Sequence, residues 1–495
     1  MRGSVVFFLA LTLAAGQSDE LARESQRARQ MMMAGQFESA IPIYLSLVKA
    51  LPGETGLRLN LALAEHMAGH EAESIPNFEA VLKVQPDALP ALISLGAARL
   101  ALHQPAEAIA PLEKAVTVEP DNRDAQAMLA GACMDSGRFE EASLHFRKLT
   151  SLAPREPRGW YGLGASNQAM SARALDRLQK RDPQSPYLAV LLADARAAQR
   201  QYRGAFALYK DALQQLPNLH GIHTALAEVY RKTGHADWAA VEEAKERALP
   251  PADCKAHPVE CDFLAGKDAQ ALTAPRPGNP SPEALFWQAK AAGELAFQAF
   301  FQLGQLPPSV ELHQFRAETA RDRRQPLESV KEWRAALELA PANPRLKREL
   351  AVSLFLAKDY QAAVDEASGF LKMAPRDAEL NFAVGDSLLR LEQLERAVPY
   401  LRAALAANPK LLPADASLGL ALSRMGKTAE AIPHLEKALA LDDDGSLHYQ
   451  LARAYQSAGR QDQARTEMAA YQAILQKSED RKQDAVEESG IGPPQ

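Results

Sequence analysis

Apolar and small residues recur at intervals of three and four along most of this chain. Within residues 91–121, a first face at this spacing is formed by Leu92, Leu95, Gly96, Arg99 and Leu102, and a second by Ala108, Leu112, Ala115 and Val116. Each spacing predicts one face of an α-helix. The break at 103–105 predicts a turn between them. Pro120 ends the second helix because proline has no N–H donor and disfavours helix in the preceding residue.

The stopping proline returns with a fixed period. Steps of 34 residues separate successive prolines in three series, which are Pro52, Pro86, Pro120 and Pro154; Pro183, Pro217 and Pro251; and Pro307, Pro341, Pro375 and Pro409. With 32 prolines in 495 residues, a random step would reach a proline about one time in fifteen. Eight matching steps therefore indicate a real internal repeat of helix, turn, helix and stop.

These repeats resemble the tetratricopeptide repeat (TPR), whose pattern is W-x2-L-G-x2-Y, then A-x3-F, then P. The residues that match parts of this pattern are Trp160, Leu163 and Gly164; Leu95 with Gly96; Leu418 with Gly419; Ala142 with Phe146; and Ala40 with Tyr44. The resemblance covers roughly residues 21–477. It implies an all-α fold, a right-handed α-solenoid of about thirteen helix-turn-helix repeats. We expect two of these, near 157–185 and 282–309, to be shortened or atypical.

Interruptions of the period predict the domain boundaries. We expect a signal peptide at 1–16, an N-terminal repeat block at 17–253, an irregular linker at 254–281 and a C-terminal repeat block at 282–477. The linker is rich in Pro and Gly ("TAPRPGNPSP"), which is typical of a loop or hinge. The last segment, 478–495, is polar, charged and without periodicity, and we expect it to be disordered.

The N-terminus predicts export. Arg2 precedes an apolar run of eleven residues from Val5 to Ala15, and small residues stand before Gln17, as in a secretory signal peptide. The alternative is a buried N-terminal helix. Elsewhere the sequence has no run of eighteen apolar residues, so we expect no stable membrane anchor and a periplasmic or extracellular location.

Charge and motifs exclude several classes of function. The formal net charge of −6 does not favour nucleic-acid binding. The sequence contains no phosphate-binding loop of the form G-x-x-x-x-G-K-[ST], no H-E-x-x-H and no G-x-S-x-G. We therefore expect a protein that is not an enzyme and needs no cofactor.

In TPR arrays the first helix of each repeat lines the concave face, so the resemblance implies a scaffold that binds protein or peptide partners there. The N-terminal candidates are Leu59, Leu63, Met67, Ile93, Met128 and Tyr161; the C-terminal candidates are Gln314, Arg345, Arg348, Phe355, Phe382, Asp386 and Arg390. The first set predicts an apolar strip and the second suits a charged or amphipathic peptide. Periodicity leaves open whether these residues pack between helices instead. Self-assembly through the repeats is the alternative function.

Two of the three cysteines stand close together in "DCKAHPVECDFLAGKD". Cys254, His257 and Cys261 suggest three alternatives: a disulfide, free thiols, or a metal site that would support metal-dependent activity. Pro258 disfavours helix at His257 and so bends the chain, which brings the two cysteines closer than a helix would. In an oxidising compartment the Cys254–Cys261 disulfide is the leading prediction.

Overall fold

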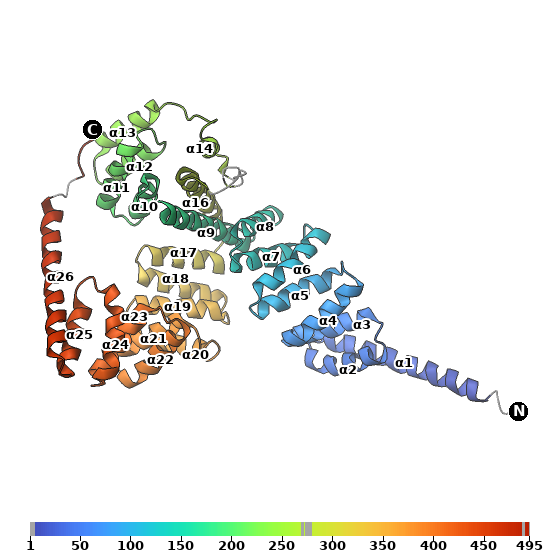
Figure 1. Ribbon diagram of the computed structural model, residues 1–495. Helices are drawn as coiled ribbons and strands as arrows, with labels where there is room; N and C mark the ends of the chain where they lie inside the picture. Colours follow the sequence, from blue (N-terminus) through green and yellow to red (C-terminus); the bar gives the residue numbers. More distant parts are fainter. Residues whose placement is uncertain (1–4, 269–271, 273–279, 488–490, 495) are drawn as a thin grey trace. The chain divides into compact units, whose positions relative to one another are not determined.

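The computed structural model describes residues 5–268, 272, 280–487 and 491–494. Figure 1 shows a succession of helices, and the described residues contain no β-strand. The predicted all-α solenoid is confirmed. Within these residues, eleven of the thirteen predicted repeats are helix pairs and two are single long helices.

The chain divides into two compact units, which are described separately. Unit 1 comprises residues 1–177 and 254–306, and unit 2 comprises residues 178–253 and 307–495. This differs from the predicted blocks 17–253 and 282–477. The physical reason is that the segment after Cys254 folds back within unit 1, where the Ser171 hydroxyl donates to the Ala289 carbonyl over 2.8 Å.

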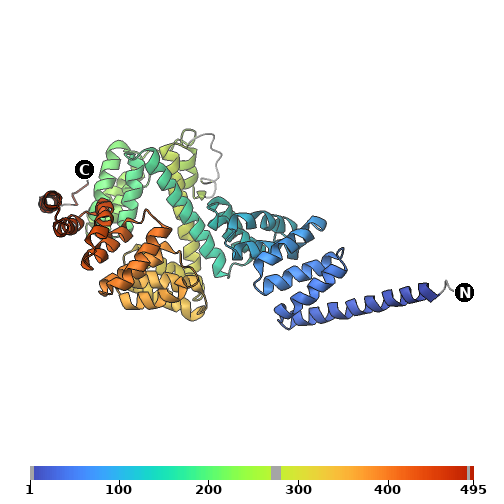
Figure 2. The ribbon, with the colours of Figure 1, turned by 60° about the horizontal axis from the view of Figure 1, so that its bottom comes forward.

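Unit 1 begins with four helix pairs in chain order (Figure 2, blue to teal). Their helices are α1 (Val5–Met33), α2 (Phe37–Ala50), α3 (Thr55–Met67), α4 (Glu71–Val84), α5 (Leu89–Ala101), α6 (Pro105–Val118), α7 (Arg123–Asp135) and α8 (Phe139–Leu152). The unit also contains most of α9 (Pro157–Arg181), α14 (Pro258–Leu264) and α16 (Pro282–Gly304). Residues 5–16 of the predicted signal peptide lie in α1, residues 1–4 lie outside the described residues, and cleavage remains a prediction.

Unit 2 contains seven helix pairs. Their helices are α10 (Pro186–Ala198), α11 (Tyr202–Gln215), α12 (Ile222–Lys232), α13 (Ala236–Ala248), α17 (Val310–Asp322), α18 (Pro326–Leu339), α19 (Pro344–Leu356), α20 (Tyr360–Leu371), α21 (Ala378–Arg390), α22 (Leu394–Ala407), α23 (Leu412–Arg424), α24 (Thr428–Ala438), α25 (Ser446–Ser457) and α26 (Gln461–Glu487). A short 3-10 helix, Leu439–Leu441, follows α24.

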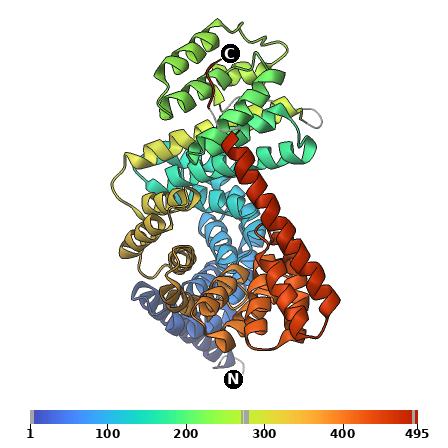
Figure 3. The same ribbon diagram turned by 90° about the vertical axis from the view of Figure 1, so that its left-hand side faces the viewer.

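Two predictions about segments outside the regular repeats need correction. Helix α26 continues to Glu487 as one helix (Figure 3, red), so the segment predicted to be disordered from 478 is helical in its first part. The predicted linker contains the short helix α14, while most of its Pro- and Gly-rich part, 273–279, lies outside the described residues. Among the described helices, none combines the length and apolar character needed to span a bilayer.

The periodic prolines act as predicted. Helices α2, α4, α6 and α8 each end two residues before one of them. Helices α9 and α16, with 25 and 23 residues, replace two repeats that we expected to be shortened helix pairs. Neither contains a proline after its first residue or a residue with positive φ, so nothing interrupts the helical hydrogen bonds.

A second feature with the same period lies in the turns. Each of the eleven helix pairs is joined through one residue in the left-handed region, at positions 35, 69, 103, 137, 200, 234, 324, 358, 392, 426 and 459. Six of these residues are glycine and five carry a side chain, including Lys358 with φ of 64°. A left-handed residue after the first helix reverses the chain and starts the second.

The paired helices approach closely at a glycine. A methyl group at Gly96 would lie 2.5 Å from Leu112 Cγ, and one at Gly385 would lie 2.6 Å from Leu401 Cγ. In both pairs the leucine follows the glycine by sixteen residues, so the same contact recurs in different repeats. The Leu-Gly part of the repeat pattern therefore has a steric cause.

Candidate functional site

A groove of about 520 Å³ opens in unit 2 among the first helices of three consecutive repeats, α17, α19 and α21. We call it the Arg345 groove. Five predicted candidates line it, which are Gln314, Arg345, Arg348, Phe355 and Phe382. The spacing of the first helices therefore brings residues of this set together, although the sequence alone did not show that they share one groove.

Aromatic and aliphatic side chains form the apolar part of the Arg345 groove. The rings of Phe355 and Phe382 lie 5.7 Å apart in an edge-to-face arrangement. Trp333 of α18 is buried beneath the groove, and Leu356 at its margin is exposed. Such a surface can receive an apolar side chain, because burial of apolar area stabilises the contact.

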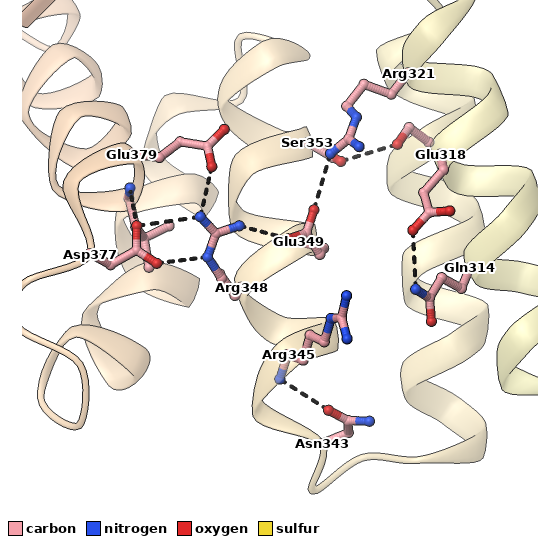
Figure 4. Close-up of polar contacts among 12 residues, drawn as sticks. Gln314, Glu318, Arg321, Asn343, Arg345, Arg348, Glu349, Ser353, Asp377 and Glu379 are labelled. Carbon is pink, nitrogen blue, oxygen red and sulfur yellow. Dashed lines mark hydrogen bonds and ion pairs between the residues drawn. The ribbon is translucent and has the colours of Figure 1, made fainter. Parts of the chain in front are cut away.

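Arg348 is held by three carboxylates at one side of the groove (Figure 4). Its Nε donates to Asp377 Oδ2 over 2.7 Å, Nη1 to Glu349 Oε1 over 2.6 Å, and Nη2 to Glu379 Oε2 over 2.7 Å. Burial disfavours the charged guanidinium, but the hydrogen bonds to Asp377 and Glu379 outweigh it and raise the pKa of Arg348 above its usual range. Arg348 therefore joins α19 to the start of α21 and is already neutralised.

Arg345 is in a different electrostatic state. Among the described residues its guanidinium has no ion-pair partner; its backbone N–H donates to Asn343 Oδ1 over 3.0 Å. Figure 4 shows its side chain extending from α19 into the space that faces α17. The charges across that space are Glu318, which accepts from Gln314 over 3.1 Å, and Arg321, which pairs with Glu349 over 3.1 Å. Arg345 is therefore the cation of the groove that is free to meet a ligand.

Two predicted groove residues, Asp386 and Arg390, do not line the Arg345 groove. Asp386 is only 5% exposed. Its Oδ1 accepts from the Ser417 hydroxyl over 2.7 Å and its Oδ2 lies 3.3 Å from Arg390 Nε. Asp386 therefore contacts the next repeat, since Ser417 lies in α23. The sequence reasoning also missed Arg321 and Glu349, whose pairing between α17 and α19 joins residues 28 positions apart.

Most side chains of the predicted N-terminal strip pack against neighbouring helices. Half-buried side chains that contact the hydrophobic cores of unit 1 are those of Leu59, Leu63, Ile93 and Met128. The ring of Tyr161 lies 6.4 Å from that of Phe300 in α16. Met67, at 54% exposed, is the one candidate of this set with a mainly exposed side chain. The alternative of packing between helices therefore describes most of this strip.

Unit 1 has an apolar surface that the sequence did not predict. Phe297 and Phe301 of α16 are 64% and 55% exposed. They line a groove of about 530 Å³ with residues of α8 and α9, among them Trp160 and Leu163. Phe297 and Phe301 stand four residues apart, a spacing that was available in the sequence, but periodicity does not show which face of a helix is covered.

The two neighbouring cysteines are paired. The sulfur atoms of Cys254 and Cys261 lie 2.07 Å apart and their Cα atoms 5.5 Å apart, at disulfide distance. His257 Nδ1 instead lies 2.5 Å from Glu283 Oε1. Sulfurs bonded to each other cannot act as thiolate ligands, which argues against the metal alternative that used both cysteines. His257, Glu260 and Glu283 can each direct one ligand atom to a common point, since these atoms lie within 4.8 Å of one another.

Most of the other histidines that the structure describes have structural partners. Pairs whose members stand nineteen residues apart, one on each helix of a repeat, are His145 with Gln126, His223 with Glu242, His313 with Glu332, His434 with Asp415 and His448 with Glu467. His223 and its partner Glu242 are both buried. These pairs join the two helices of a repeat.

Comparisons with known proteins agree with this geometry. Two tetratricopeptide repeat families match, one over residues 99–166 and the other over residues 316–378, 363–411 and 416–479. No curated protein shows significant sequence similarity to the chain.

Solved structures that resemble part of the chain include "MamA 41-end from Desulfovibrio magneticus RS-1", which is 24% identical, with a TM-score of 0.31, over 34% of this chain and 97% of that one. "Crystal structure of MamA protein" is 19% identical, with a TM-score of 0.30, over 37% of this chain and 98% of that one. Repeated helix pairs, the periodic prolines and the family matches lead to one conclusion: the chain contains tetratricopeptide repeats.

Proposed function

We propose that this protein is a non-enzymatic scaffold that binds amphipathic peptide segments of partner proteins in the Arg345 groove. The observation that carries the proposal is the contrast between two arginines one helical turn apart. Arg348 is neutralised by three carboxylates, whereas the Arg345 guanidinium has no ion-pair partner among the described residues. An acidic side chain of a ligand can pair with Arg345 while an adjacent apolar one contacts Phe355 and Phe382.

The chemistry of the groove defines the ligand. Aromatic and apolar contacts supply most of the binding free energy in a groove of this kind, and the charge supplies specificity. An exposed charge pair contributes about 0.2–1 kcal/mol. Reversal of the charge also adds repulsion, so we expect Arg345→Glu to weaken binding roughly tenfold, or about 1.4 kcal/mol.

Peptide display on the full chain tests this function. We expect the protein to select peptides in which Asp or Glu stands beside an aromatic or aliphatic residue. The Arg345→Glu variant should lose those peptides and select ones with Lys or Arg at the same place. The matched control is Arg334→Glu, an exposed residue of α18 that does not line the groove. Selection of the same peptides by all three proteins would show that the groove is not the binding site.

Export is a second part of the proposal. The N-terminal pattern of Arg2 and an apolar run supports a signal peptide, and the Cys254–Cys261 pair at disulfide distance supports an oxidising compartment. Fractionation of cells that express the full chain, with N-terminal sequencing, tests it. A mature N-terminus near Gln17 in the exported fraction is the expected result, and an intact N-terminus in the cytoplasm would contradict it.

Self-assembly is the alternative function, and the exposed pair Phe297 and Phe301 favours it. Light scattering at several concentrations distinguishes the two. A monomer at all concentrations supports the scaffold. A molecular mass that rises with concentration, and that Phe297→Asp returns to the monomer value, would support self-assembly.

A further inference from the structure

A short segment near the end of the chain lies against the repeats α11–α13 in unit 2. The buried hydroxyl of Tyr230, in α12, donates to the backbone carbonyl of Gly492 over 2.8 Å. Ile491 lines a cleft of about 660 Å³ together with residues 200–204, Thr233 and His235. Figures 1 and 3 both place the C-terminal end of the chain beside the green helices. We call this the Tyr230 cleft; it lies at the turns within repeats and shares no residue with the Arg345 groove.

Aromatic rings pack against the ring of Tyr230. Tyr230 lies edge-to-face with Phe206 and with Trp238, in each case with ring centroids 5.6 Å apart. The imidazole of His235 stacks on Trp238 with centroids 4.1 Å apart. Aromatic surfaces of this type recognise proline-containing segments, because such segments are already extended and lose little entropy on binding.

The segment has that property. It reads Ile491-Gly492-Pro493-Pro494. Both prolines have φ fixed near −65°, and Gly492 is biased towards an extended backbone by the proline that follows. The ligand is therefore largely ordered before it binds, and the carbonyl of Gly492 has only to meet one donor.

A second tyrosine at the same repeat position shows what is special about Tyr230. Tyr455 follows Leu451 by four residues, as Tyr230 follows Leu226. The hydroxyl of Tyr455 donates to Glu436 of the preceding repeat over 2.5 Å. Among the described residues, the Tyr230 hydroxyl has no partner other than Gly492. Burial and the nearby Glu242 raise the pKa of Tyr230 to about 12, so the phenol stays protonated and able to donate.

We propose that the Tyr230 cleft is a second peptide-binding site and that the chain's own Ile491–Pro494 segment is its ligand. Because the segment is tethered, its effective concentration is on the order of millimolar, and a site with a Kd of roughly 100 μM would be about nine-tenths occupied in the intact chain. A proline-containing segment of another protein would bind only after it displaced this one.

The test uses a labelled peptide of residues 488–495 and two forms of the protein, the full chain and the chain ended after Glu487. In fluorescence anisotropy we expect the shortened chain to bind the peptide about ten times more tightly than the full chain does. In the shortened chain, Tyr230→Phe should weaken binding about 2- to 12-fold, the range for loss of one hydrogen bond. Tyr455→Phe is the matched control and should leave it unchanged.

A full-length variant guards against loss of fold on truncation. Ile491→Asp keeps the length of the chain and should open the cleft to the labelled peptide as truncation does. Equal binding by the full and shortened chains, or no binding by either opened form, would overturn the proposal. So would dimers of the full chain that truncation abolishes, since the segment would then occupy a second copy. Because the Arg345 groove is not involved, Arg345→Glu should not alter any of these results.

Discussion

The close approach of the paired helices predicts opposite effects for two glycine-to-alanine changes in neighbouring repeats. Gly385 in α21 faces Leu401, and a methyl group there would lie 2.6 Å from Leu401 Cγ and 3.1 Å from its backbone nitrogen. Carbon atoms in contact normally stay about 3.5–4.0 Å apart, so the Leu401 side chain or the helices α21 and α22 must shift. Gly369 in α20 has nothing within 4 Å of the position of such a methyl group.

The magnitudes follow from these distances. Alanine in a helix interior is favoured over glycine by about 0.5–1 kcal/mol, and Gly369→Ala should gain this amount. At Gly385 the same gain is offset by the cost of inserting a methyl group into a packed contact, about 1–3 kcal/mol. Gly385→Ala should therefore be less stable than Gly369→Ala by about 1–3 kcal/mol, since helix propensity cancels between the two.

Urea unfolding followed by far-UV circular dichroism measures the difference. Repeat arrays can unfold in steps, so hydrogen exchange of the α21 and α22 amides should accompany it and show where the loss occurs. We expect faster exchange in these helices for Gly385→Ala alone. Equal stability of the two variants would refute the steric reason given for the glycine of the repeat.

The remaining predictions concern single residues. Lys358→Gly should raise the free energy of unfolding, measured in urea, by up to about 1 kcal/mol. A side chain in the left-handed region costs roughly 1–2 kcal/mol, and the larger conformational entropy that glycine loses on folding offsets part of the gain. Arg348→Met should lower it by about 1.5–3 kcal/mol, the range for hydrogen bonds to charged groups, and the loss should shrink at high salt. Despite its burial, Glu242 has a lowered pKa because it accepts a hydrogen bond from His223. Its contribution to the free energy of unfolding is therefore present above pH about 4.5 and disappears as the pH falls through the lowered pKa. Glu242→Gln should lower the free energy of unfolding at pH 7 and match the wild type in strong acid. Thiol titration of denatured chain from an oxidising compartment should find one thiol, that of Cys133, and three after reduction; three without reduction would disprove the disulfide.

The repeat and its helices were predictable because proline has a direct effect on helix geometry. The turns show what the proline period does not predict. Their left-handed residues follow the same period of 34, but the period is hidden where Lys358 or Arg200 stands in place of glycine. The two single helices α9 and α16 were also missed, since a missing turn changes the period without showing whether one helix or two result.

The groove was predictable only in part, for an electrostatic reason. Helical spacing placed Arg345 and Arg348 on the same surface, but whether each guanidinium is neutralised by an ion pair depends on carboxylates in other repeats. Asp377, which neutralises Arg348, follows it by 29 residues. Asp386 was misplaced for the converse reason, because its partner Ser417 lies 31 residues further along the chain. Pairings of this length follow from the packing of repeats and have no local signal in the sequence.

Titration calorimetry of a display-selected acidic, amphipathic peptide tests the central claim most directly. The wild type, Arg345→Glu and the control Arg334→Glu should be measured under the same buffer conditions at about 0.15 M salt. The account predicts that Arg345→Glu weakens the Kd roughly tenfold while Arg334→Glu leaves it within about twofold. The same Kd for all three proteins would contradict the assignment of the Arg345 groove as the peptide-binding site.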